Sequence, residues 1–400
     1  MTSDPVTPQP TRHWVLAASC LLLVALNLRS VISAVSPVLP EIQSELQLGA
    51  GPAGFALTLT VLCFGLGALV CPLLLRVLRP TTLLSIGMVV LLLGGLARAL
   101  MPGVPAFFIG TAAIGAGVAV GNVVVPVIIR LNFADRVPML TACYSVILSS
   151  GSVFAAGLTL PFMHLVGGDW RVGQLPWVAL VGLTLLIWGA ALLTRTVTSR
   201  QAGPAGGGVR ELLRNPLAWC VTAVMGLQSL VFYAFLSWGP SVMTQGGIDP
   251  TTAGLLISLL SVVAVTANIV GPIVVRGRRT VPGLIAMAVC YVVGLALVPW
   301  GLVPAVIGVC ILGLGVGATL PYALTLIATA FPVRLTGAMS SMAQGFGYLL
   351  AGLGPWLFGA LHEIDPTWHA SLVFDAVAGV AFTVVALVAR RLAARHATPS

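Results

Sequence analysis

The residue with the clearest potential for chemistry is Arg29, a single charged side chain inside a long apolar stretch near the N-terminus. The residues around it read LNLRSVISAVSPVLPEI over 26–42. A guanidinium in hydrocarbon costs between about 2.5 and 17 kcal/mol, depending on how the cost is measured. Arg29 lies about 15 residues into its apolar run, too deep to reach water easily. We therefore expect it to face a water-filled cavity and to bind the negative or electron-rich group of a solute.

Two structural roles for Arg29 stay open beside this one. The guanidinium could bond to backbone carbonyls, or it could pair with Asp375, the only other ionisable group well inside an apolar run. We expect Asp375 instead to meet lipid headgroups, a water pocket or a neighbouring hydroxyl. Arg98 lies near the end of its own run, where a long side chain can extend to the interface, so we assign it a structural role.

Other polar residues within apolar runs are candidates for the same cavity. Ser33 and Ser36 follow Arg29 at i+4 and i+7 and share its helical face, although serine hydroxyls also bond back to their own helix. Trp238 is typical of an interfacial or gate aromatic. Ser36 and Trp238 are not among the residues that we predict to bind the substrate. Those are Arg29, Ser33, Asn122, Gln228, Tyr233, Tyr322, Gln344 and Tyr348.

The elements that hold these residues must lie in a membrane. The chain has 400 residues, of which 58% are hydrophobic and 7% charged, with a mean hydropathy of +1.07. A soluble domain carries about 25% charged residues, so these charges cannot cover a water-facing surface. The length allows about a dozen spans of roughly 20 residues.

Composition also argues against several classes of partner and cofactor. The net charge of +9 does not indicate nucleic-acid binding, because the arginines form short clusters between apolar runs. The seven cysteines lie in apolar runs without the spacing of a disulfide or zinc site. The glycine-rich strings at 110–121 and 313–317 lack the Lys-Ser/Thr of a phosphate loop, so we interpret them as helix-packing surfaces and expect no cofactor and no metal.

The apolar runs predict an all-α integral membrane protein with twelve transmembrane helices. Runs of about 20 residues without alternating polarity indicate helices rather than barrel strands. The expected spans lie near 14–38, 52–76, 81–101, 104–130, 138–163, 174–194, 216–244, 252–276, 281–299, 302–329, 336–361 and 368–390. Pro37 and Pro40 are expected to loosen the end of the first span.

The arginines predict the orientation. With the N-terminus in the cytoplasm, all of the 19 arginines except Arg29, Arg98 and Arg171 lie on the cytoplasmic side, as the positive-inside rule requires. An even number of spans then places the C-terminus there too, in a multi-pass protein of the cytoplasmic (plasma) membrane. The predicted units are a tail at 1–13, a six-helix bundle at 14–194, a linker at 195–215, a second bundle at 216–390 and a tail at 391–400.

The two halves repeat each other. At an offset of 200 residues, Gly54 matches Gly254 and Arg76 matches Arg276. At an offset of 198, Gly115 matches Gly313. Parallel six-helix repeats indicate two pseudo-symmetric bundles with a solute site between them near the membrane midplane.

This organisation resembles the major facilitator superfamily. NLRSVISAVSPVLPEIQSEL in the first span and MAQGFGYLLAGLGPWLFGALHE in the eleventh resemble the family of the cyanate permease and the 2-nitroimidazole transporter, as do QSLVFYAFLSWGPSVM and GLGVGATLPYALTLI. The loop CPLLLRVLRPTT departs from the wider superfamily, because it lacks the acid of the usual Asp-Arg pair. The resemblance implies the major facilitator fold and transport of small anionic or weakly polar solutes.

We therefore predict a monomeric transporter that moves a small anionic or polar solute across the lipid bilayer by alternating access, with Arg29 as its central cation. A drug or metabolite exporter of the same fold, with a structural Arg29, is an alternative. An integral-membrane enzyme is a distant alternative, because the five histidines lie at span ends or in tails and no carboxylate cluster accompanies them.

Overall fold

The computed structural model describes residues 11–194, 209–275 and 277–397. Within these ranges the chain is helical and contains no strand. The elements are α1 (Thr11–Ser33), η1 (Ser36–Val38), α2 (Leu39–Leu46), α3 (Ala50–Leu74), α4 (Pro80–Leu100), α5 (Val104–Asn132), η2 (Ala134–Arg136), α6 (Val137–Leu165), α7 (Trp170–Leu193), α8 (Val209–Leu212), α9 (Pro216–Gln245), α10 (Pro250–Val274), η3 (Gly277–Arg279), α11 (Thr280–Leu297), α12 (Leu302–Thr329), α13 (Val333–Ile364) and α14 (His369–Ala397).

The twelve predicted spans each coincide with one long helix, which confirms the predicted fold class. In the described part of the chain, 11 helices are long and apolar enough to cross a membrane. The remaining long helix, α13, has 32 residues but also contains many glycines and the polar Ser340, Ser341 and Gln344. It packs between α3 and α9, so its polar residues need not meet lipid.

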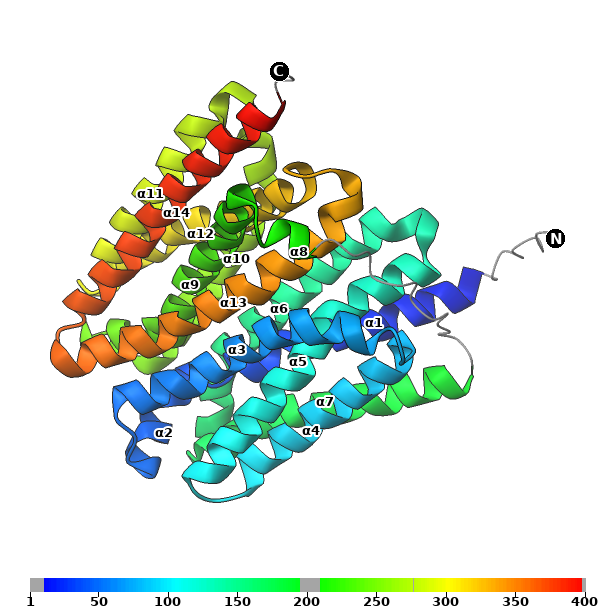
Figure 1. Cartoon of the computed structure of the whole chain (residues 1–400). Helices are drawn as coiled ribbons and strands as arrows, with labels where there is room; N and C mark the ends of the chain where they lie inside the picture. Colours follow the sequence, from blue (N-terminus) through cyan, green and yellow to red (C-terminus); the bar gives the residue numbers. More distant parts are fainter. Residues whose placement is uncertain (1–10, 195–208, 276, 398–400) are drawn as a thin grey trace.

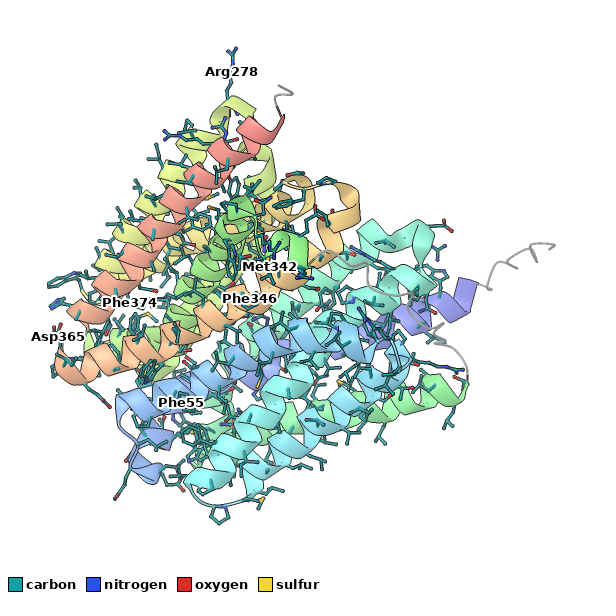
Figure 2. The ribbon with its side chains drawn as sticks, in the orientation of Figure 1. Phe55, Arg278, Met342, Phe346, Asp365 and Phe374 are labelled. Atoms are coloured by element: carbon teal, nitrogen blue, oxygen red, sulfur yellow. The ribbon has the colours of Figure 1, made fainter. Side chains whose placement is uncertain are left out.

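The helices form two bundles that lie side by side, α1–α7 and α9–α14 (Figure 1). The bundles diverge toward the end where α1 begins and α14 finishes, which we call the terminal end. The opposite end, where α1 finishes at Ser33 and α13 at Ile364, is called the distal end. Arg278 extends from the terminal end of the second bundle, and Asp365 lies at its distal end (Figure 2).

Glycines bring the two bundles into close contact. A Cβ on Gly54 of α3 would lie 2.5 Å from the carbonyl oxygen of Pro355 on α13. The repeat-related Gly254 of α10 faces Ala156 of α6 in the same way, at 2.8 Å. The matching positions confirm that the internal repeat is a structural pseudo-symmetry, with equivalent helices meeting across the interface.

The interface is longer on one side than on the other. Along α3 and α13 the close approaches continue from Gly54 to Gly65, whose Cβ would lie 2.7 Å from the carbonyl oxygen of Gly345. On the α6 and α10 side, the closest polar contact is the 2.8 Å bond from Ser258 Oγ to the carbonyl of Val153, in the distal half of α6.

Glycine-rich strings also pack helices within each bundle. A Cβ on Gly117 of α5 would lie 2.5 Å from the carbonyl oxygen of Gly87 on α4. A Cβ on Gly313 of α12 would lie 3.0 Å from the carbonyl oxygen of Leu260 on α10. The predicted packing role of these strings is confirmed, since a Cβ would overlap the facing backbone at Gly117 and crowd it at Gly313.

The first span ends earlier than its apolar run. α1 finishes at Ser33, and the chain turns through η1 and α2, which carry Pro37 and Pro40 in their first turns. A proline supplies no N–H to continue the preceding helix, so the predicted loosening here is confirmed. At the other end of the chain, α14 continues to Ala397, past the predicted boundary at 390.

The expected interfacial position of Arg98 is wrong, and so are two of the three surroundings expected for Asp375, lipid headgroups and a neighbouring hydroxyl. The third, a water pocket, stays a prediction. Arg98 does not extend to an interface: it is 2% exposed and donates from Nη2 to the carbonyl oxygen of Val31 at 2.9 Å. Val31 belongs to the last turn of α1, and the sequence could not place its carbonyl beside α4. Asp375 does not meet headgroups, because α14 packs against α11 and leaves the carboxyl 0% exposed. Neither of its oxygens has a hydrogen-bond partner among the described residues.

Some predictions fall outside the described residues. These are the tails at 1–10 and 398–400, most of the linker (195–208) and Arg276.

Candidate functional site

A cavity of about 350 Å³ lies between the two bundles. Its walls come from α1 and α6 of the first bundle and from α9, α10, α12 and α13 of the second. Its α6 residues, 145–152, belong to the half of that helix nearer the terminal end. The polar residues that line it are Arg29, Ser145, Ser149, Ser152, Gln228, Ser229, Tyr233, Ser261, Asn268 and Tyr348.

Arg29 of α1 and Tyr233 of α9 meet across this cavity. Arg29 Nη1 donates a 2.7 Å hydrogen bond to the Tyr233 hydroxyl, and its guanidinium carbon lies 5.5 Å from the centre of the Tyr233 ring. Arg29 forms no ion pair with a carboxylate of the described residues. The central cation is therefore held by a neutral phenol and faces a space large enough for a small solute.

An aromatic cluster fixes the position of Tyr233. Its ring centre lies 5.1 Å from that of Phe232, 6.0 Å from that of Phe64 and 6.4 Å from that of Tyr348, all in edge-on arrangements. Phe64 belongs to α3 and thus brings the first bundle into the cluster. Edge-on packing is a favoured aromatic geometry, and it holds the Tyr233 hydroxyl toward Arg29.

Four of the eight predicted site residues line the cavity: Arg29, Gln228, Tyr233 and Tyr348. The amide nitrogen of Gln228 already bonds to Ser229 Oγ at 2.5 Å and to the carbonyl of Met225 at 3.2 Å. Whether these four contact a solute stays a prediction.

The other four predicted residues do not line it. Ser33 donates to Ser152 Oγ at 3.0 Å and lies on the distal side of Arg29. Asn122 accepts a long, 3.5 Å bond from the Tyr144 hydroxyl.

Tyr322 and Gln344 are also directed elsewhere. Tyr322 lines a separate pocket together with Arg390 and packs on Phe382, with ring centres 6.5 Å apart. Gln344 donates to Ser340 Oγ at 2.8 Å, one turn earlier on α13. A polar residue within a span predicted a protein-facing side chain, but it did not determine which protein surface that side chain meets.

Two stripes of polar residues in the cavity were not predicted. Ser145, Ser149 and Ser152 follow each other at i, i+4 and i+7 on α6, and Ser261 and Asn268 are seven residues apart on α10. These intervals place each set on one helical face. The same spacing that selected Ser33 and Ser36 would have found them.

Hydrogen bonds between the bundles close the cavity toward the distal end. Ser36 Oγ donates to the carbonyl oxygens of Leu236 and Ser237, at 2.6 and 3.0 Å. Thr58 Oγ1 donates to the carbonyl of Gly352 at 2.5 Å, and the backbone N–H of Gly51 donates to Glu363 at 2.8 Å. The cavity thus lies where the bundles diverge and is sealed where they meet.

Trp238 belongs to the same sealed region. Its indole is 1% exposed and donates to the carbonyl of Pro355 at 2.8 Å, within the second bundle. The ring packs on Trp368, with centres 5.3 Å apart. It is thus a buried packing residue in this conformation.

Comparison with known proteins supports transport. The chain is 32% identical over 361 residues to "Uncharacterized transporter YycB" of Bacillus subtilis, covering 88% of each chain. It is 31% identical over 382 residues to the "2-nitroimidazole transporter" of Escherichia coli, covering 93% of this chain and 94% of that one. It is 24% identical over 371 residues to the E. coli "Cyanate transport protein CynX", covering 92% of this chain and 95% of that one.

Solved structures agree on the fold. The crystal structure of a D-xylose-proton symporter superposes with a TM-score of 0.75 at 15% identity, covering 94% of this chain and 97% of that one. An inward-facing, unoccupied bacterial homologue of the human lysosomal transporter Spinster superposes with a TM-score of 0.74 at 16% identity, covering 97% of this chain and 98% of that one. A family model described as Major Facilitator Superfamily matches residues 20–355. The chain belongs to the major facilitator superfamily and is a membrane transporter of small solutes, not an enzyme.

Proposed function

We propose that the solute is a small anion, or a compact molecule with an electron-rich group, and that Arg29 is its central contact. The observation that carries this proposal is the guanidinium directed at the 350 Å³ cavity and bonded across it to a neutral hydroxyl. A cation removed from bulk water is costly unless it is compensated. An anion bound in this cavity compensates it.

Charge balance also explains how one cation serves a transport cycle. A monoanion bound to Arg29 forms a neutral complex, so the loaded site is closed more cheaply than the empty one. Arg29 and Tyr233 belong to different bundles. The Tyr233 hydroxyl accepts a hydrogen bond from Arg29 and can donate its own hydrogen to the same anion, so the anion bonds to both halves. In alternating access the loaded halves then rock to open the distal end.

The relatives suggest the size of the solute. Two of them are described as transporters of 2-nitroimidazole and of cyanate. Both molecules are compact and carry oxygen and nitrogen atoms that accept hydrogen bonds, and both fit a cavity of this volume. We propose a solute of the same class.

The membrane potential constrains the direction of transport. Moving one negative charge inward against a negative-inside potential costs about 2.3 kcal/mol per 100 mV. Import of an anion therefore needs a co-transported proton or an exchanged anion, whereas export does not.

We further propose that the protein is a monomer in the cytoplasmic membrane, with both termini cytoplasmic and the halves 14–194 and 216–390 joined by a linker at 195–215. The arginine distribution along the chain supports this orientation. The terminal end would then face the cytoplasm and the cavity would open inward. Fluorescence of a C-terminal GFP fusion together with inactivity of a C-terminal alkaline phosphatase fusion tests the orientation.

Uptake by proteoliposomes tests the function. Labelled cyanate, 2-nitroimidazole and a panel of small anions are offered with and without a pH gradient. We expect Arg29→Gln to reduce the initial rate for the transported anion at least tenfold. The matched control is Arg171→Gln, which removes an arginine paired at the surface with Glu45. If the Arg29→Gln protein transports an uncharged drug at the wild-type rate, and neither protein transports an anion, the exporter alternative is favoured.

A further inference from the structure

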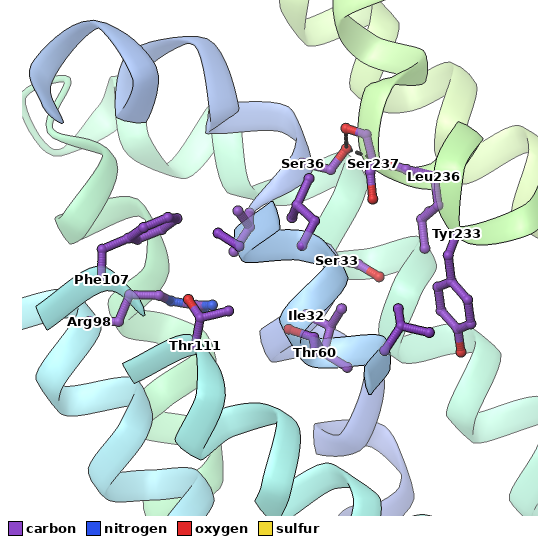
Figure 3. Close-up of a pocket in the computed structure, with 14 residues that line it drawn as sticks. Ile32, Ser33, Ser36, Thr60, Arg98, Phe107, Thr111, Tyr233, Leu236 and Ser237 are labelled. Atoms are coloured by element: carbon purple, nitrogen blue, oxygen red, sulfur yellow. Dashed lines mark hydrogen bonds between the residues drawn. The ribbon is translucent and has the colours of Figure 1, made fainter. Parts of the chain in front are cut away.

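A second, much smaller pocket lies on the distal side of the Arg29 cavity. It measures about 30 Å³ and is enclosed by the end of α1, by α3, α4 and α5, and by α9. Figure 3 shows Arg98 and Thr111 on one side of it and Ser33, Ser36 and Tyr233 on the other. Tyr233 also lines the large cavity, so this one side chain borders both spaces.

Arg98 carries a buried and incompletely compensated charge. Its side chain is 2% exposed, and its one hydrogen bond within the described chain runs from Nη2 to the carbonyl of Val31. Its Nε is buried without an acceptor, and no carboxylate of the described residues forms an ion pair with it. The carbonyl end of α1 offers only part of a negative charge. Buried guanidinium groups are normally paired with an anion.

Thr111 supplies a second unpartnered group at the same pocket. It lies on α5, next to α4, and is 3% exposed. Its Oγ1 has no hydrogen-bond partner among the described residues. Buried polar groups without partners are rare in native proteins, and here two of them lie around one space. The arrangement points to an occupant that accepts hydrogen bonds from both.

The size and the lining of the pocket select the occupant. A volume of 30 Å³ holds a single water-sized group. Val35, Val61 and Phe107 form apolar walls, which suit a weakly hydrated ion. A water molecule would satisfy Thr111 but leave the charge of Arg98 uncompensated. We propose that this pocket binds one halide-sized monoanion, such as chloride, between Arg98 and Thr111.

The proposed site has a consequence for the conformational cycle. Its walls include Leu236 and Ser237 of α9, whose carbonyls accept the bonds from Ser36 that close the distal end. A bound halide is therefore enclosed by both bundles and stabilises the distally closed conformation. Separation of α9 from the end of α1 opens the site and releases the ion.

Halide-dependent thermal stability tests the site without requiring transport. The full-length protein is placed in lipid nanodiscs in chloride-free gluconate and titrated with sodium bromide. We expect a saturable rise in melting temperature for wild type and for Arg29→Gln, in which the central site is removed. Thr111→Val keeps the Arg98–Val31 bond but should raise the half-saturating bromide concentration at least tenfold. Arg98→Gln should abolish the rise in melting temperature. Thr383→Val, which removes a buried threonine hydroxyl on α14, is the matched control and should behave as wild type.

Anomalous diffraction from bromide-soaked crystals locates the ion directly. A peak between Arg98 and Thr111 supports the proposal. A peak only beside Arg29, an unchanged titration in Thr111→Val, or no halide dependence in wild type would overturn it. Because Arg29→Gln retains the site, failure here is distinguishable from failure of the proposed function.

Discussion

Arg29 and Tyr233, 204 positions apart in the chain, are joined by a 2.7 Å hydrogen bond across the two bundles. The bond links the central cation of α1 to a ring that Phe64, Phe232 and Tyr348 hold in place. It is the direct polar contact between the bundles inside the solute cavity, and its loss should affect binding more than folding.

Replacement of Tyr233 by Phe removes the hydroxyl and keeps the ring packing. Hydrogen bonds to charged groups contribute about 1.5–3 kcal/mol, so we expect solute affinity to fall at least tenfold. The measurement is the concentration dependence of uptake in proteoliposomes. Tyr322→Phe, which removes a tyrosine hydroxyl that lines a separate pocket, serves as control. A Tyr233→Phe protein with wild-type affinity would exclude the hydroxyl from the binding site.

Replacement of Arg29 by Lys keeps the charge but loses the planar fork of the guanidinium. A lysine is not equivalent where one guanidinium forms two hydrogen bonds, here the observed bond to Tyr233 and the proposed bond to the solute. We expect the Lys variant to bind the solute at least tenfold more weakly than wild type, yet more tightly than Arg29→Gln does. Uptake rates of the three proteins at several solute concentrations check this order. Equal activity of the Lys and Arg proteins would show that charge alone is sufficient.

The contact between α3 and α13 predicts a strong effect at Gly54. An added Cβ would meet the backbone carbonyl of Pro355 at 2.5 Å, and backbone cannot move aside cheaply. Overpacking of this kind costs about 1–3 kcal/mol, so Gly54→Ala should lower the melting temperature in detergent. Gly189→Ala is the matched control, because nothing lies within 4 Å of the Cβ position there. Equal melting temperatures for the two variants would contradict the close approach.

The loop before α14 predicts a pH dependence of stability. Asp365 accepts bonds from the Thr367 hydroxyl and from the backbone N–H groups of Ala370 and Thr367, and these lower its pKa to about 2. A carboxyl whose pKa is lowered on folding stabilises the fold above its ordinary pKa, and this contribution is lost as the pH falls toward 2. Asp365→Asn should therefore melt lower than wild type at pH 7, and the difference should vanish near pH 2. A difference that persists unchanged at low pH would exclude the carboxylate as its source.

The sequence predicted the helices and the position of Arg29 beside a cavity, but only four of the eight predicted site residues line that cavity. Apolar runs have a direct physical meaning in lipid, so the helix positions followed from composition, and the prolines after Ser33 marked the end of α1. Which neighbour a polar side chain meets depends on helix rotation and packing. Tyr322 is a polar residue of a cavity-lining helix, yet it turns toward Phe382 and away from Arg29.

Arg98 illustrates the same limit for charged residues. Its position near the end of α4 predicted contact with an interface, but the fold covers it with α5 and the bend after α1. That cover comes from residues that are distant in sequence. Local patterns therefore could not reveal the buried guanidinium.

The unequal interface between the bundles determines the shape of the motion that empties the cavity. α3 and α13 remain in glycine-mediated contact from Gly54 to Gly65, whereas Ser258 of α10 bonds to the carbonyl of Val153 in the distal half of α6. The opening is therefore a wedge with its spine along α3 and α13. A solute that leaves by the wide side of this wedge would pass between α6 and α10, which both line the cavity.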